Sequence, residues 1–170
     1  MRVVIFQADC RDYRVGFFRE LSFKCELTLI HFGTPKFNLN PRLNEIQASV
    51  VRIFGFYYLK NYKNYVANAD VVILPFDVHW LNIFCLSLYK KCRVVLWGHG
   101  LGRNTLVRKV KVSLINRASS VITYSEKGAE DIEGVGISKD KIFIAYNTLE
   151  VLNSQDLSCA DKDSIIYVGR

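Results

Sequence analysis

The sequence predicts an α/β domain built on a parallel sheet, and three observations carry this prediction. The 170 residues are 50% hydrophobic and 23% charged, a balance typical of globular domains and unlike that of disordered, collagen-like or disulfide-scaffold chains. Short β-branched runs alternate with segments of helical period, as in the strand–helix–strand crossovers of parallel sheets. One well-packed core is expected, because a chain of this length buries roughly 70% of the surface that it exposes when unfolded.

Two strands and an intervening helix are predicted at the start of the chain. Val3–Phe6 is a continuous apolar run that ends in a polar loop. Leu27–His31 is a near-continuous apolar run of the kind that parallel sheets bury on both faces. Between them, the apolar residues that share one helical face are Phe17, Phe18, Leu21 and Cys25.

The middle of the chain predicts three further strands and a buried helix. Val50–Ile53, Val71–Leu74 and Val94–Trp97 are short runs rich in β-branched residues. Trp80–Tyr89 is apolar nearly all round, so we expect a deeply buried helix there.

The remaining elements continue the same alternation. Asn104–Arg117 has a helical period and Val121–Tyr124 is a strand. Ser125 is a good N-cap for a helix over Glu126–Glu133, and Ile142–Ala145 is a strand. We therefore expect one domain over residues 1–150, a polar linker over 151–163, and at 164–170 the first strand of a second domain that this sequence does not contain.

Several classes of protein are disfavoured. The apolar N-terminal run is too short for a secretory signal, and Pro75, Asp77, His79 and Asn82 interrupt the longest apolar stretch. The scattered cysteines favour a reducing, cytosolic setting, and neither a metal site nor a cofactor is expected. They are Cys10, Cys25, Cys85, Cys92 and Cys159.

The segment Gly98–Arg103 is the main candidate ligand loop. It follows a strand and opens a helix, so its backbone amides are placed to meet an anion, but its glycine spacing is not that of a dinucleotide fingerprint. A structural turn and a ligand-facing loop both remain open. His99 is its one side chain able both to donate to and to accept from a hydroxyl near neutral pH. The glycines of Gly134–Lys139 follow a helix and indicate a C-cap rather than a P-loop.

The chain has a formal net charge of +7, and basic residues crowd into one predicted helix. A solvated helix face explains them, as does attraction to anionic lipid, with Arg108, Lys109 and Lys111 facing the membrane. Nucleic acid is not expected, because aromatic side chains do not interleave with these charges.

Six segments, in their order and spacing, carry a resemblance to a known family: Tyr13–Phe18, Ala69–Ile73, Trp97–Gly100, Arg117–Glu126, Asp140–Glu150 and Ile166–Arg170. Together they resemble the N-terminal half of a GT-B glycosyltransferase of family 4. The resemblance implies a Rossmann-like parallel sheet with helices on both faces, forming one domain of a GT-B pair. It also implies retaining transfer of a sugar from a nucleotide-sugar donor to a glycan or lipid-linked acceptor, in cell-surface polysaccharide biosynthesis.

The resemblance also implies roles for individual residues. His99 matches the loop histidine that faces the transferred sugar and is the implied catalytic residue. Tyr13 and Arg14 are implied to contact the acceptor. Arg170 matches the arginine that contacts the donor diphosphate, a role that suits a guanidinium fork, and for Ser125 and Glu126 a capping role stays open beside a ligand role. The implied donor contacts are Gly98, Gly100, Ser125, Glu126 and Arg170.

Departures from the family pattern limit what this chain is expected to do. Gly16 stands where proline is common, and Thr148 where glycine is common. The acidic donor-clasping motif would lie in the second domain, so the chain alone is not expected to catalyse transfer, and a second chain is one source of the donor half. We expect a cytoplasmic protein, with peripheral binding at the inner membrane face open. The alternative is a non-catalytic α/β binding module that docks on anionic membrane or a partner protein.

Overall fold

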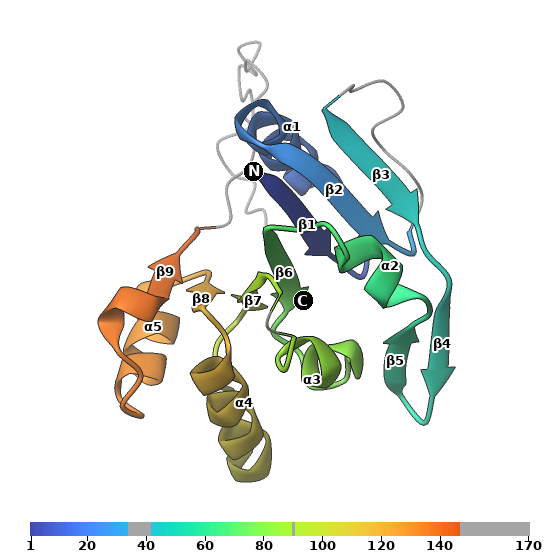
Figure 1. The fold of residues 1–170 in the computed structure, drawn as a ribbon. Helices are drawn as coiled ribbons and strands as arrows, with labels where there is room; N and C mark the ends of the chain where they lie inside the picture. Colours follow the sequence, from blue (N-terminus) through green and yellow to red (C-terminus); the bar gives the residue numbers. More distant parts are fainter. Residues whose placement is uncertain (34–41, 90, 147–170) are drawn as a thin grey trace, which may run out of the picture.

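A seven-stranded parallel sheet forms the centre of the chain (Figure 1). The computed structural model describes residues 1–33, 42–89 and 91–146. The strand order is β3-β2-β1-β6-β7-β8-β9, so the direction of chain progression reverses between β1 and β6. The strands are β1 (Arg2–Phe6), β2 (Glu26–His31), β3 (Leu43–Gln47), β6 (Val71–Pro75), β7 (Arg93–Gly98), β8 (Ser120–Thr123) and β9 (Ile142–Ile144).

Helices cover both faces of the sheet, which confirms the predicted fold class (Figure 1). Crossovers between parallel strands are right-handed, so opposite directions of progression place their helices on opposite faces. Phe18 of α1 packs in one core with Val3 and Ile5, whereas Leu114 of α4 packs in the other with Val4. The helices are α1 (Asp12–Lys24), α2 (Tyr62–Val66), α3 (Asn82–Leu86), α4 (Thr105–Arg117), α5 (Glu126–Glu133) and the 3-10 turn η1 (Lys139–Lys141).

A small antiparallel hairpin stands apart from this sheet. It consists of β4 (Val50–Ile53) and β5 (Phe56–Leu59), with Ile53 opposite Phe56. Val50–Ile53 is therefore a strand as predicted, but it belongs to a separate ribbon, and β3, β5 and α2 lie where no element was predicted. The Tyr57 amide donates to the His79 carbonyl at 2.8 Å, which ties the hairpin to the loop after β6.

The predicted helix over Trp80–Tyr89 is wrong in its length, because α3 spans only Asn82–Leu86. Trp80 pairs with Tyr57 of the hairpin instead of continuing a helix. The Asn82 side chain accepts from the Leu59 amide at 2.7 Å and donates to the Leu59 carbonyl at 3.1 Å, which joins the helix to β5. Leu88 lies beyond the helix and is exposed, not buried.

The C-terminal part of the sequence prediction can be compared with the structure only as far as residue 146. Ser125 accepts from the Gly128 amide at 3.2 Å and caps α5 over the predicted range. Residues 147–150, the predicted linker 151–163 and the predicted strand at 164–170 lie outside the described residues. Within the described ranges, no helix is long and apolar enough to cross a bilayer.

Candidate functional site

A cavity of about 300 Å³ lies at the carboxyl ends of β1, β6, β7 and β8; we call it the cleft. It straddles the position where the strand order reverses, and ligands of open α/β sheets bind outside the carboxyl ends of strands at such a position. The cleft is therefore the candidate site. Its lining residues are Gln7, Arg14, Pro75, Phe76, Asp77, Trp97, Gly98, His99, Lys111 and Tyr124.

The glycine-rich loop after β7 forms one wall of the cleft. A Cβ at Gly98 would lie 2.9 Å from the Cβ of Phe76, so the close approach of these segments requires glycine. Gly100 has φ +94 and Gly102 has φ +80, in the left-handed region that glycine adopts without a Cβ penalty. These glycines shape the turn, which places Gly98 and His99 at the cleft.

His99 lies exposed at the mouth of the cleft. Its ring centroid is 4.7 Å from that of Tyr124, with the planes tilted by 53°. Within the described part of the chain, no hydrogen bond occupies its ring nitrogens, which leaves both able to meet a ligand. An imidazole so placed can donate to or accept from a hydroxyl group of that ligand.

Arg14, near the start of α1, is held rigidly at the base of the cleft. Its two terminal nitrogens donate to the Gln7 side chain at 2.8 Å and to the Tyr124 hydroxyl at 2.7 Å. Its guanidinium carbon lies 5.0 Å from the Trp97 ring centroid and 5.5 Å from that of Tyr13, a geometry of cation–π contact. Tyr13 stays outside the residues that line the cleft.

Two buried donors at the cleft lack acceptors. They are Nε of Arg14 and Nε1 of Trp97, and both residues line the cavity. Buried donors are paired in the great majority of structures, and an unpaired donor points to a missing water, ion or ligand. Both atoms belong to side chains that line the cleft but are themselves buried from solvent.

Lys111 of α4 also belongs to the cleft. Its ammonium donates to the Gly100 carbonyl at 2.6 Å and lies 4.5 Å from the Phe76 ring centroid. Burial lowers the pKa of Lys111, although the negative charge of Asp77 acts in the opposite direction. The side chain thereby fixes the glycine-rich loop and brings a second cation to the site. Lys111 was expected among the membrane-facing cations, although its position four residues after Val107 and three before Leu114 is the signal that would have assigned it to the apolar stripe.

Arg108 and Lys109, which were also expected to face a membrane, differ from Lys111 in their surroundings. Arg108 forms an ion pair with Asp131 at 2.7 Å, which joins α4 to α5. Lys109 is exposed. The three side chains therefore do not share one surface, because Lys111 turns into the cleft.

Ser125 and Glu126 lie at the start of α5 and do not line the cleft. The hydroxyl of Ser125 serves as the helix cap, as described above. The Glu126 carboxylate accepts from the Tyr146 hydroxyl at 2.9 Å, and this bond raises the pKa of Tyr146. Arg170 lies outside the described residues. The part of the chain that the structure describes holds no cluster of three side chains able to bind a metal.

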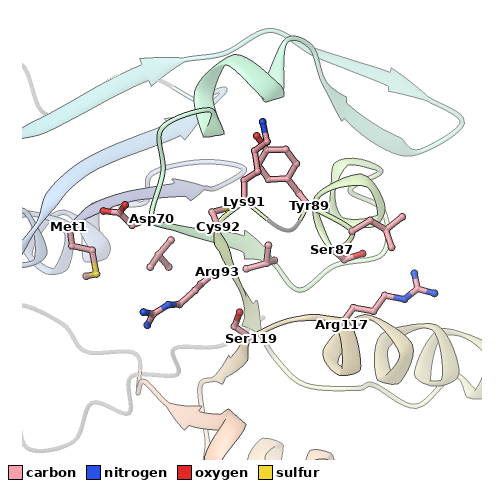
Figure 2. A pocket seen from close by; sticks show the side chains of 12 residues that line it. Met1, Asp70, Ser87, Tyr89, Lys91, Cys92, Arg93, Arg117 and Ser119 are labelled. Carbon is pink, nitrogen blue, oxygen red and sulfur yellow. The ribbon is translucent and has the colours of Figure 1, made fainter.

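A larger cavity of about 1000 Å³, the amino-edge cavity, lies at the opposite ends of the strands (Figure 2). Lys91, Arg93 and Arg117 line it, but Arg93 and Arg117 point in opposite directions in Figure 2 and do not converge on one point. Asp70 is engaged by the Arg2 amide at 2.7 Å, and this bond lowers its pKa. Despite its size, this cavity lacks convergent polar groups, which are what a small-molecule site requires.

Comparison with known proteins is informative at the level of structure alone. No family model and no curated protein match the sequence. Anabaena Alr3699/HepE, solved in complex with UDP-glucose, is 12% identical with a TM-score of 0.60, over 88% of this chain and 44% of that one.

Two further solved structures share the fold at similarly low sequence identity. The UDP-GlcNAc 2-epimerase of Methanocaldococcus jannaschii is 19% identical with a TM-score of 0.54, over 86% of this chain and 46% of its own. The lipopolysaccharide outer core galactosyltransferase WaaB is 15% identical with a TM-score of 0.54, over 90% and 47%. The chain spans less than half the length of each of these proteins, and it has a Rossmann-like α/β fold of the GT-B type.

Proposed function

We propose that this chain is the acceptor-binding half of a retaining glycosyltransferase, which transfers a sugar from a nucleotide sugar to a glycan or lipid-linked acceptor. The observation that carries the proposal is the cleft at the switch point of a GT-B-type sheet, with His99 at its mouth and the cations of Arg14 and Lys111 in its lining. The family 4 resemblance of the sequence motifs supports the retaining class.

The chemistry of the cleft suits a sugar that carries an anionic group. Tyr124 lines the cleft with an aromatic ring beside the buried Trp97, and the His99 imidazole can bind a hydroxyl of the transferred sugar. Arg14 and Lys111 bring two cations to a site with one exposed carboxylate, Asp77, and fixed cations favour phosphate oxygens. In this proposal Tyr13 and Arg14 serve the acceptor.

The donor half belongs to a separate part of the enzyme. We assign Gly98, Gly100 and Arg170 to the donor side, together with Ser125 and Glu126 in a capping or ligand role. A continuation of the polypeptide or a second chain supplies the remaining donor contacts. The coverage of less than half of each similar structure supports this division.

Nuclear magnetic resonance titration tests this function directly. The chain has two tryptophans, so a Trp97→Phe variant assigns the Trp97 indole resonance without ambiguity. We expect glycosyl phosphates to shift the Trp97 indole and the Gly98 and His99 amides, and radiolabelled UDP-glucose to give no transfer product with this chain alone. Unchanged cleft resonances at millimolar glycosyl phosphate would contradict acceptor binding. Robust turnover by the chain alone would contradict the half-enzyme proposal.

The alternative function is that of a non-catalytic module that docks on an anionic membrane or a partner protein. The observation that favours membrane docking is the exposed apolar tip of the hairpin of β4 and β5, not the basic helix α4.

A further inference from the structure

The hairpin of β4 and β5 carries an apolar tip, which we define as residues Ile53, Phe54, Gly55 and Phe56. Phe54 is 99% exposed, Ile53 49% and Phe56 40%. Figure 1 shows the hairpin as a ribbon that extends away from the parallel sheet. Single exposed apolar residues are ordinary, but three together on a projecting element mark an interaction surface.

The backbone of the tip makes the choice of phenylalanine unexpected. Phe54 has φ +47 and Gly55 has φ +85, so both central residues of the two-residue turn are left-handed. Hairpin turns of this kind favour Asn-Gly, because a side chain with a Cβ is disfavoured there and asparagine tolerates it best. Phe54 therefore combines a strained backbone with a side chain that nothing in the described chain buries.

The base of the hairpin is aromatic and rigid. Phe32, Tyr57 and Trp80 stack with ring centroids 5.8 to 6.1 Å apart. The Arg52 guanidinium lies 5.6 Å from the Tyr57 ring centroid. Hydrogen bonds between Tyr57 and the loop at His79–Leu81 hold the ribbon in place. The tip is therefore presented on a fixed support.

The charged side chains of the hairpin and of the segments on either side of it have one sign, although the exposed Asp77 lies in the loop that holds the hairpin. Between Glu45 and Asp70 the sequence contains Arg52, Lys60 and Lys63 but no aspartate or glutamate. All three cations are exposed. An apolar tip flanked by aromatic rings and cations matches the acyl region, the interface and the anionic headgroups of a bilayer.

We propose that the hairpin tip inserts into the interface of an anionic lipid bilayer and is the membrane-docking element of this domain. An acidic protein surface would match the cations but leave Phe54 in water. Helix α4 offers less, because Arg108 is paired with Asp131 and Lys111 faces the cleft. The loop that holds the hairpin also contributes Asp77 to the cleft. This proposal does not depend on sugar transfer.

Flotation with lipid vesicles tests the proposal on the complete 170-residue chain. We expect binding to equimolar phosphatidylcholine and phosphatidylglycerol that weakens with salt and is much weaker with phosphatidylcholine alone. Phe54→Asn should lower the bound-to-free ratio at least about tenfold. Its thermal midpoint should stay equal or rise, since asparagine suits the turn. Phe23→Gln, which alters another exposed phenylalanine, should bind as the parent does.

A gain-of-signal variant makes the result independent of any loss of folding. Phe54→Trp should give a larger blue shift on addition of anionic vesicles than the parent chain, whose Trp80 and Trp97 are both buried. Absence of vesicle binding by the folded chain would overturn the proposal. So would binding that survives Phe54→Asn, or a dimer in light scattering that Phe54→Asn dissociates without any lipid binding.

Discussion

Cationic side chains line both the cleft and the amino-edge cavity, at opposite ends of the same strands. In the cleft, Arg14 and Lys111 are part-buried and each hydrogen bonds to defined oxygens. In the amino-edge cavity, Arg93 and Arg117 diverge into solvent, although that cavity is more than three times larger. Convergence and fixed geometry, not volume, distinguish a site that can orient a ligand.

The largest effect that would test this contrast comes from the floor of the cleft. Trp97 is buried against Phe17 and Phe18, with ring centroids 5.5 and 6.5 Å away, and it also supports Arg14. Trp97→Ala should lower the free energy of unfolding by about 3–5 kcal/mol, because it leaves a cavity in a packed core. Urea unfolding followed by circular dichroism measures the change. A loss below 1 kcal/mol would show that the cleft is not a rigid part of the fold.

Arg14→Ala should have the next largest effect. It removes the charged partner of Gln7 and of the Tyr124 hydroxyl, and we expect a loss of about 2 kcal/mol in unfolding free energy. Tyr124→Phe removes only the hydroxyl and should cost about 1 kcal/mol. A double-mutant cycle between the two substitutions measures their coupling. Strict additivity would contradict the hydrogen bond as a stabilising contact.

Much of the fold was predictable from the sequence, because buried parallel strands need continuous apolar runs such as Val3–Phe6. Strand β3 escaped prediction because three of its five residues are polar and follow no alternation, as the edge of a sheet allows; there His31 meets Glu45 at 2.7 Å. The contact between Arg14 and Tyr124 joins residues 110 positions apart, and no local pattern specifies such a pairing. Most of the cleft therefore depends on tertiary structure.

The pH dependence of stability offers a smaller, directional test of Lys111. Its pKa is lowered in the folded protein, so the unfolded chain binds the proton more tightly. Stability therefore rises with pH from the folded pKa towards the unfolded value near 10.5. Lys111→Met should remove this rise, whereas Lys109→Met, on the exposed side of α4, should keep it. Identical alkaline profiles for the two variants would contradict a cleft-facing Lys111.

The smallest changes in stability are expected from substitutions at the amino-edge cavity. Arg93→Gln and Arg117→Gln should each alter the unfolding free energy by less than about 0.5 kcal/mol, because both side chains reach into solvent.

Inorganic phosphate separates the two cavities, since a ligand that binds the folded state alone stabilises it by about 1.4 kcal/mol at ten times its dissociation constant. We expect inorganic phosphate to bind in the cleft and to raise the thermal midpoint of the parent chain. This rise should persist in Arg93→Gln and Arg117→Gln. It should disappear in Lys111→Gln, which lacks the cation on the Gly100 carbonyl. The opposite pattern would place the anion site at the amino ends of the strands, where only outward-pointing side chains would hold it, and would reverse the assignment of the functional edge.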